Sequence, residues 1–257
     1  MRYLVIVAAL LASSAPAVAQ DDGGTRVRVG VGGQNRPAAI GADRREWAPL
    51  FDFALQRGPG PFDFEAPDDN FDIELFEKDG FSAGPVANYQ AGRKNRDFGE
   101  RVGKVPNTIE AGAFVQYQLS EAFRLRGEVR KGVGGHNGLI ASFGADAVWR
   151  DGDRYVFSAG PRVNFTNSRY QREFFGVSAE RSLITGLDEF DPDGGLQSIG
   201  ATSGVNYRVS GPFGLFGFAR FERLVGDAGK SPIVRELGSR SQMSAGLGVT
   251  YTFTVKR

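Results

Sequence analysis

The sequence predicts an all-β protein, an antiparallel transmembrane β-barrel of about 12 strands, and three observations lead to this prediction. The last patterned stretch, 240–253, alternates between bulky apolar residues and small or polar ones. The same period-2 pattern recurs along most of the chain, as in strands, whose successive side chains point to opposite faces. Short turns and longer loops alternate between the patterned segments, as they do in outer-membrane barrels.

The stretch 240–253 shows the pattern most clearly. One face is apolar and consists of Met243, Ala245, Leu247, Val249, Tyr251 and Phe253. The other face is small or polar and consists of Ser244, Gly246, Gly248, Thr250 and Thr252. A small polar face cannot be the buried side of a soluble sandwich, but it suits a wall with lipid outside and a wet lumen inside. We therefore expect this stretch to be the closing strand of the barrel.

The N-terminus has the features of a secretory signal peptide. Arg2 provides a basic start, residues 3–12 form an apolar stretch, and residues 17–19 (A-V-A) form a small-x-small cleavage site. We expect residues 1–19 to be removed and residues 20–257 to form one outer-membrane barrel domain; an uncleaved anchor is the alternative. No other stretch has the roughly 18 apolar residues that a transmembrane helix needs.

Composition excludes several classes of function. The chain has 31 Lys+Arg and 30 Asp+Glu, and the predicted mature chain loses only Arg2 among these, so it is close to neutral. A neutral chain gives no indication of nucleic-acid binding. There are no cysteines, which excludes disulfides and thiolate metal sites. We expect no cofactor and no metal.

Twelve patterned segments are predicted as strands. They are 25–34, 46–55, 62–66, 71–76, 81–90, 108–119, 122–131, 138–150, 154–166, 195–208, 213–224 and 240–253. Pro49 weakens 46–55 as a central strand. The segments 62–66 and 71–76 flank P-D-D-N and have the weakest pattern. If these two form one extended loop, the barrel has ten strands, and the number stays even.

The connections divide into two classes when counted back from the closing strand. The short turns S-G-P, D-G-D, S-E-A, E-K-D-G and R-G-P-G-P all fall on one side. The longer loops 35–45, 91–107, 132–137, 167–194 and 226–239 all fall on the other. Outer-membrane barrels have short periplasmic turns and longer extracellular loops. This pattern predicts a cell outer-membrane location.

A row of charged residues faces the predicted lumen. Its members are Arg124, Arg126, Glu128, Arg130, Asp146, Arg150, Arg162 and Arg208, and Arg26, Arg28, Arg220 and Glu222 could extend it. Charges in a dry space cost several kcal/mol each, so they must be paired or wet. One interpretation is a pore or solute site that selects anions. The favoured interpretation is an ion-pair network that fills and braces a narrow barrel.

Two loop features have alternative interpretations. His136, the single histidine, could be the catalytic base of a lipid hydrolase, but no nucleophile or orienting acid stands at a recognisable spacing, so we favour a turn role in its loop. The G-V-G-G run before it lacks the Lys-Ser/Thr of a phosphate loop. The basic residues of loop 91–107 could contact acidic headgroups of outer-membrane lipid; a solvated loop is the alternative.

Three long motifs resemble a known family. They are F-R-L-R-G-E-V-R-K-G-V-G-G-H-N-G-L (123–139), S-A-G-P-R-V-N-F-T-N-S-R-Y (158–170) with F-F-G-V (174–177), and S-P-I-V-R-E-L-G-S-R-S-Q-M-S-A-G-L-G-V-T-Y (231–251). In these stretches the chain resembles the MipA/OmpV family of outer-membrane proteins. The resemblance is close over 108–253 and looser over 25–107. One departure is that residues 254–257 follow Phe253, whereas such barrels commonly end on the closing aromatic.

The resemblance implies an outer-membrane barrel without a catalytic motif. In this family, MipA is a scaffold between a lytic transglycosylase and a bifunctional penicillin-binding peptidoglycan synthase. The leading expectation is therefore a non-enzymatic scaffold linked to cell-wall machinery. A small-solute channel with a preference for anions is the first alternative, and an outer-membrane lipid hydrolase is the second.

Overall fold

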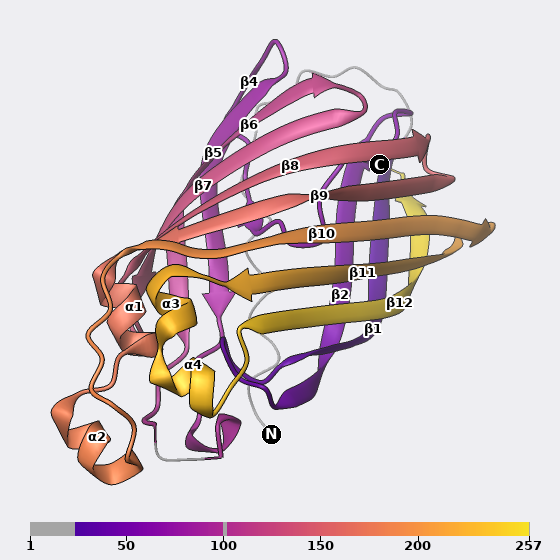
Figure 1. Cartoon of the computed structure of the whole chain (residues 1–257). Helices are drawn as coiled ribbons and strands as arrows, with labels where there is room; N and C mark the ends of the chain where they lie inside the picture. The colour runs from indigo at the N-terminus through magenta and orange to yellow at the C-terminus, as the bar shows by residue number, and fades with distance from the viewer. Residues whose placement is uncertain (1–23, 100–101, 257) are drawn as a thin grey trace.

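The computed structural model describes residues 24–99 and 102–256 (Figure 1). The predicted signal peptide lies outside these residues. The described chain forms a curled sheet with helices gathered at one end (Figure 1). The strands are β1 (Thr25–Pro37), β2 (Arg45–Arg57), β3 (Phe71–Asp72), β4 (Phe76–Lys78), β5 (Phe81–Gln90), β6 (Thr108–Ser120), β7 (Phe123–Val133), β8 (Leu139–Asp151), β9 (Tyr155–Thr166), β10 (Gly195–Ser210), β11 (Phe213–Leu224) and β12 (Ser241–Val255).

The sheet follows the order β2-β1-β12-β11-β10-β9-β8-β7-β6-β5-β3, and β4 also pairs with β5. All of these pairings are antiparallel. β1 and β12 pair from Thr25 opposite Val255 to Asn35 opposite Ala245. The predicted closing strand therefore joins the first strand, and the prediction of an all-β antiparallel barrel wall is confirmed.

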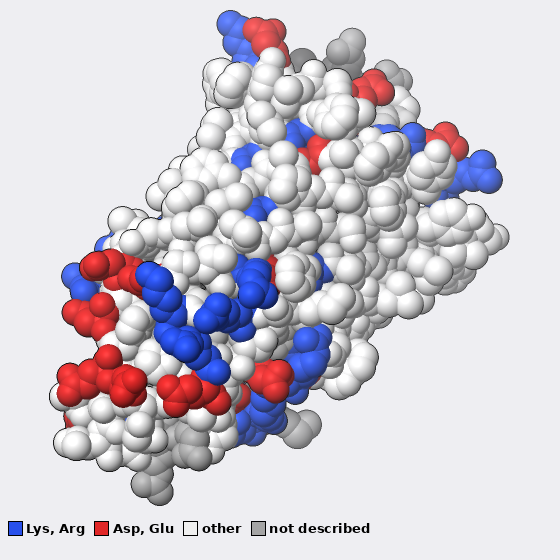
Figure 2. Space-filling view, viewed as in Figure 1, with Lys and Arg blue, Asp and Glu red and all other residues white. Residues whose placement is uncertain are grey.

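The outer face of the wall is apolar. On β12, Met243, Leu247 and Tyr251 are exposed, whereas Thr250 on the opposite face is buried. Figure 2 shows charged side chains gathered toward the two ends of the molecule, with the visible face between them mostly uncharged. An apolar belt between polar ends is the arrangement that a bilayer requires of a barrel.

Short turns connect the strands at the end where β1 begins and β12 ends, which we call the turn end. The E-K-D-G turn between β4 and β5 has positive φ at Asp79 (51°) and Gly80 (80°). Two successive left-handed residues match the twist of a two-residue hairpin, and Asp-Gly is a preferred pair there. A side chain at Gly80 would also meet the backbone oxygen of Gln118 at 2.7 Å.

The opposite end, which we call the cap end, is folded rather than irregular. The predicted loop 167–194 contains α1 (Ser168–Phe175) and α2 (Ala179–Thr185), and the predicted loop 226–239 contains α3 (Gly226–Lys230) and α4 (Pro232–Glu236). A short 3-10 helix, η1 (Asn95–Asp97), lies in loop 91–107. No helix in the described part of the chain is long and apolar enough to cross a membrane.

Side chains from these loops form a small hydrophobic core of their own. Phe174 and Phe175 of α1 and Ile233 and Val234 of α4 are almost completely buried. Asn167 caps α1 by accepting a hydrogen bond from the Tyr170 amide. The helices were not predicted because each is only two turns or shorter, too short for a helical period to stand out.

The prediction of a strand at 62–66 is wrong. Residues 58–70, which we call the interior segment, pair with no strand. They contact inward side chains of β1, β7, β9 and β10, and therefore lie inside the curl. Pro59, Pro61 and Pro67 interrupt the segment and lack the N–H that a ladder needs.

The direction of the neighbouring strands explains this path. β2 ends at the turn end, where Arg57 lies opposite Thr25, and β4 ends there too, where Lys78 lies opposite Phe81. β2 and the β3–β4 stretch therefore run in the same direction. Two successive strands that run in the same direction need a long connection from one end of the sheet to the other, and here that connection passes through the lumen. No backbone pairing joins β2 to β3 within the described residues, so β2 is an edge strand, which suits Pro49.

The predicted strand 71–76 is present with a break. Its two ends are β3 and β4, which pair with successive parts of β5. Between them, the amides of Ile73 and Leu75 still donate to the carbonyls of Pro85 (3.2 Å) and Ala83 (3.0 Å). The stretch therefore continues the wall from the point where the interior segment leaves the lumen.

Candidate functional site

The predicted row of charges lies mainly on the inner face of the curl. On β7, the period of two places Arg124, Arg126, Glu128 and Arg130 on one side, and all four are buried. Asp146 on β8 and Arg162 on β9 are also buried. A buried charge has to be paired, so the partners of these groups decide what the lumen can do.

The interior segment supplies some of the partners. Asp68 accepts hydrogen bonds from Arg162 Nε and Nη2, both at 2.9 Å. Asp69 accepts from both terminal nitrogens of Arg124, at 2.5 and 3.1 Å. These are two-pronged guanidinium–carboxylate pairs, the strongest geometry available to arginine. The aspartates of P-D-D-N thus hold the segment against the wall.

The end of the segment continues the contact. At the start of β3, Asp72 Oδ2 lies 2.5 Å from Arg126 Nη2. Asn70 donates to Glu128 at 2.6 Å. Phe64 of the interior segment also lies beneath Arg124, whose guanidinium carbon is 4.7 Å from the ring centroid. Stacking of this kind favours the charged guanidinium in a place from which water is largely excluded.

Acids on the wall neutralise the remaining charge. Asp146 joins two arginines, with Arg124 at 2.6 Å and Arg162 at 2.7 Å. Glu128 similarly contacts Arg126 and Arg130. Burial alone would raise the pKa of Asp68, but its bonds to Arg162 and the charge of Arg220 lower that pKa below the ordinary value. Each buried arginine of β7 and β9 in the network therefore has at least one carboxylate partner.

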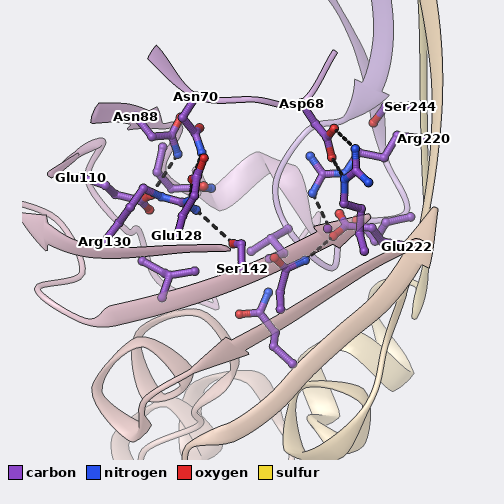
Figure 3. Close-up of a pocket in the computed structure, with 18 of the residues that line it drawn as sticks. Asp68, Asn70, Asn88, Glu110, Glu128, Arg130, Ser142, Arg220, Glu222 and Ser244 are labelled. Carbon is purple, nitrogen blue, oxygen red and sulfur yellow. Dashed lines mark hydrogen bonds and ion pairs between the residues drawn. The ribbon is translucent and has the colours of Figure 1, made fainter. Parts of the chain in front are cut away.

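A cavity of about 370 Å³ lies beside this network on the cap side (Figure 3). Its charged lining is balanced between six arginines and six acids: Arg36, Arg124, Arg126, Arg130, Arg162, Arg220, Asp68, Asp69, Glu110, Glu128, Asp146 and Glu222. Figure 3 shows Arg130 between Glu110 and Glu128, and Arg220 near Glu222 and Asp68. This cavity is polar, but its lining carries no excess of positive charge for selecting anions.

Two members of the predicted row lie apart from the network. Arg150 is near the turn end, 3.6 Å from Asp153 and 2.9 Å from the Phe62 carbonyl. Arg208 is exposed at the turn end, and its side chain forms no ion pair among the described residues. Of the possible extensions, Arg220 and Glu222 pair with each other at 2.9 Å in the lumen. Arg28 pairs with Asp52 at 2.7 Å.

His136 is buried beneath α1 rather than displayed on a loop. Its Nδ1 accepts from the Gly138 amide at 3.1 Å, which leaves Nε2 to donate to Glu110 at 3.1 Å. The Tyr170 ring packs edge-on against it, with centroids 4.7 Å apart. The position suits the turn role, because the buried imidazole holds the Gly138 amide and the Glu110 carboxylate at the base of the loop. The described residues contain no cluster of acids and histidine that could hold a metal ion.

The basic residues of loop 91–107 include one buried arginine and several exposed side chains. Arg93 is buried and donates to the backbone carbonyls of Val102, Gly103, Glu173 and Phe174. Burial lowers its pKa to about 10, so it remains charged at neutral pH. The exposed members Lys94, Arg96 and Lys104 remain free for the predicted lipid contact, and Arg101 lies outside the described residues.

Sequence reasoning missed the aspartates at 68, 69 and 72 as partners of the arginine row. Asp68 and Asp69 lie between the two weakest predicted strands and Asp72 lies within one of them, and their contacts lie 54 to 94 positions away along the chain. One signal was available: a proline-flanked acidic run in a chain whose predicted lumen had more arginines than acids.

A family comparison now identifies the group to which these features belong. The model of the family "MltA-interacting protein MipA" matches residues 29–253, which is nearly the whole described wall. The chain belongs to the MipA family. MipA proteins are an outer-membrane family, and the apolar outer belt agrees with that location. The resemblance noted in the three motifs is therefore confirmed.

Solved structures that align with this MipA-family chain are outer-membrane proteins. An outer-membrane channel from Pseudomonas putida F1 is 12% identical, with 94% of this chain and 100% of that chain covered and a TM-score of 0.44. A bacterial polysaccharide outer-membrane secretin is 8% identical, with 92% and 100% covered and a TM-score of 0.43. The NanC porin is 7% identical, with 88% and 98% covered and a TM-score of 0.40. No curated protein matches the sequence.

Proposed function

We propose that this outer-membrane barrel is a non-enzymatic scaffold that binds proteins of the cell-wall machinery. The observation that carries the proposal is the occupied lumen. The interior segment crosses it and is held by paired charges on β7 and β9. A lumen filled in this way favours binding through the outer rims over free passage of solutes. The name of the family, MltA-interacting protein, also supports a binding role.

The rim at the turn end is the surface that we assign to the partner. In outer-membrane barrels the short turns face the periplasm, where cell-wall enzymes act. The turns here end in exposed charged residues, which are Glu77, Lys78, Asp79, Glu121, Asp151 and Arg154. Mixed charges on a rim suit a transient, polar interface. The proposed partners are a lytic transglycosylase and a penicillin-binding peptidoglycan synthase.

Site-specific crosslinking tests this assignment. A photoreactive amino acid is placed at Asp79 or Glu121 on the turn end, and at Glu180 or Glu189 on the cap end as matched exposed controls. The proteins captured from native envelopes are then identified by mass spectrometry. We expect a transglycosylase or a synthase to be captured by crosslinkers at the turn-end positions and not by those at the cap-end positions. Capture of neither enzyme at any turn position would overturn the proposal.

A solute channel is the second candidate, and one observation favours it. Two cavities lie on the two sides of the interior segment. The segment contributes Asp68 to the lining of the cavity of about 370 Å³ and Phe62 to the lining of the cavity of about 300 Å³. A segment that moved aside would join them. Planar-bilayer recordings separate the two functions: regular current steps with the refolded parent protein support the channel, and a silent bilayer supports the plugged scaffold.

A further inference from the structure

The smaller cavity, which we call the turn-end pocket, differs in charge from the cap-side cavity. Its volume is about 300 Å³, and its lining contains Arg26, Arg28, Arg208 and a single acid, Asp153. Three arginines against one aspartate leave a surplus of two positive charges. The cap-side cavity, with six arginines and six acids, has no surplus. Of these two cavities, the turn-end pocket is therefore the one with an excess of positive charge.

Hydrogen-bonding capacity also remains free in this pocket. Arg26 Nη1 pairs with Asp153 at 2.7 Å, but Arg26 Nε is buried without a partner. The Arg208 guanidinium has no ion pair among the described residues. Asp153 is already shared, because it also accepts from the Phe62 amide at 2.9 Å. Donors thus outnumber the acceptors that the pocket itself provides.

The interior segment shapes the floor of the pocket. The Phe62 ring lies under two guanidinium groups, with the Arg26 carbon at 4.8 Å and the Arg28 carbon at 5.1 Å from its centroid. Stacking on a ring fixes the plane of an arginine and lowers the entropy lost when a ligand binds. Thr250, Thr252 and Asn206 complete the lining with hydroxyl and amide groups, and the Asn206 Oδ1 atom has no partner.

Nearby acids do not cancel the surplus. Asp52 neutralises Arg28 through an ion pair at 2.7 Å, but Arg150 adds a further positive group beside the pocket, 3.6 Å from Asp153. Asp63 and Glu65 of the interior segment are close but line neither cavity. Burial raises the pKa of both carboxyl groups, and that of Glu65 to about 7, so the negative charge of Glu65 is reduced at neutral pH.

We propose that the turn-end pocket binds a phosphomonoester of a small polar molecule, the size of a sugar phosphate. A phosphomonoester carries between about −1.5 and −2 charges at pH 7, which matches the surplus. Its oxygens accept from the guanidinium groups of Arg208 and Arg26, both of which line the pocket, in the geometry that arginine provides for phosphate. The hydroxyls of the body pair with Thr250, Thr252 and Asn206. This site does not depend on the scaffold role, and each proposal can fail without the other.

Isothermal titration of the full-length refolded protein in detergent micelles tests the site. The probes are glucose 6-phosphate and uncharged glucose. We expect glucose 6-phosphate to bind and glucose not to bind, with affinity falling as salt concentration rises because the contacts are between charges. Equal affinity for the two probes, or no heat from glucose 6-phosphate at low salt, overturns the proposal.

Arg208 is the decisive position because it is exposed, so its replacement leaves the wall intact. We expect Arg208→Ala to weaken binding of glucose 6-phosphate at least tenfold and Arg208→Lys to weaken it less. The matched control is Arg154→Ala, which removes an exposed arginine from the same end that lines neither cavity. Equal affinities of the Arg208→Ala and Arg154→Ala proteins would contradict the assignment.

Discussion

Arg162 on β9 and Asp68 of the interior segment face each other across 94 positions of sequence, with two nitrogens of the guanidinium each 2.9 Å from a carboxylate oxygen. This pair shows why the segment lies inside the barrel. A carboxylate in two-pronged contact with arginine keeps its charge in a place where an unpaired charge would cost several kcal/mol. The wall supplies the arginine and the segment supplies the carboxylate, so each neutralises the buried charge of the other.

Asp68→Asn is expected to lower the free energy of unfolding by about 2 kcal/mol. Removal of the only partner of a buried charge costs roughly 3–5 kcal/mol. The loss is smaller here because Arg162 retains its ion pair with Asp146 at 2.7 Å. Urea unfolding in micelles, followed by tryptophan fluorescence, measures the difference. The control is Asp191→Asn, whose pair with Arg172 is exposed and should contribute less than about 1 kcal/mol. Equal losses in the two variants would contradict the proposed role of Asp68.

The same variant should change the acid side of the stability profile. The pKa of Asp68 is lowered in the folded protein, so its contribution is present above the ordinary value of 3.8 and is lost as the pH falls through the folded value. Between pH 5 and pH 2, the parent should therefore lose more stability than Asp68→Asn. Parallel profiles over this range would show that Asp68 does not titrate in this way.

Glu65→Gln is expected to stabilise the protein at alkaline pH. Glu65 lies on the interior segment and forms no ion pair among the described residues, and desolvation by the surrounding protein, with the charges of Asp69 and Asp72, raises its pKa to about 7. An acid whose pKa is raised on folding contributes most below its unfolded value of 4.5 and loses this contribution as the pH rises through 7. The melting temperature of the variant should exceed that of the parent at pH 8 and equal it at pH 4.5. A difference that does not change with pH contradicts the argument.

Arg93→Met is expected to loosen the cap and leave the wall intact. Arg93 ties loop 91–107 to the C-terminal end of α1 through bonds to Val102 (3.1 Å) and Phe174 (2.5 Å) carbonyls. Its removal leaves buried carbonyls without donors, at about 1–3 kcal/mol each. Hydrogen exchange should accelerate in residues 168–175 but not in β9 or β10. Arg96→Met, at an exposed position of the same loop, is the control and should change neither.

His136→Ala is expected to destabilise the cap end without removing a chemical activity. The change leaves a cavity under Tyr170 and takes the acceptor from the Gly138 amide, a combined loss of about 2–4 kcal/mol. Thermal unfolding measures the loss. Phospholipid and ester hydrolysis by the parent and the variant are compared in parallel. A hydrolysis rate that falls in a variant with an intact barrel would support the hydrolase alternative instead.

The predicted signal peptide is tested by N-terminal sequencing of protein purified from outer membranes. Cleavage after the A-V-A site predicts Gln20 as the first residue. The basic start and the short apolar stretch both favour removal over retention as an anchor. A purified protein that begins at Met1 would contradict the prediction.

Most of the wall follows from the sequence because a strand in a membrane is a local pattern. Ten of the predicted segments lie on full-length strands, within a few residues at each end, from β1 to β12. Lipid outside and polar lumen inside force every second residue to be apolar, and this constraint needs no knowledge of distant contacts. The same alternation placed Arg124, Arg126, Glu128 and Arg130 on one face.

The pairing of those charges could not be predicted in the same way. Alternation gives the side of the sheet on which Arg162 lies, but it carries no information about Asp68, whose own surroundings have no period. The helices of the cap could not be predicted from the sequence for a similar reason. The helices α3 and α4 have five residues each, and helices this short are stabilised by packing against one another.

The sequence alone determined the barrel class, the inner and outer faces of its strands, the alternation of turns and loops, and the family motifs. Each of these follows from stretches that are continuous in the sequence. The tertiary structure decided that residues 58–70 cross the lumen, that the arginines of β7 and β9 are neutralised there, and that Arg208 is left free at the turn end. These outcomes depend on which charges meet after the sheet has curled, and charges are paired by distance in space rather than by spacing along the chain.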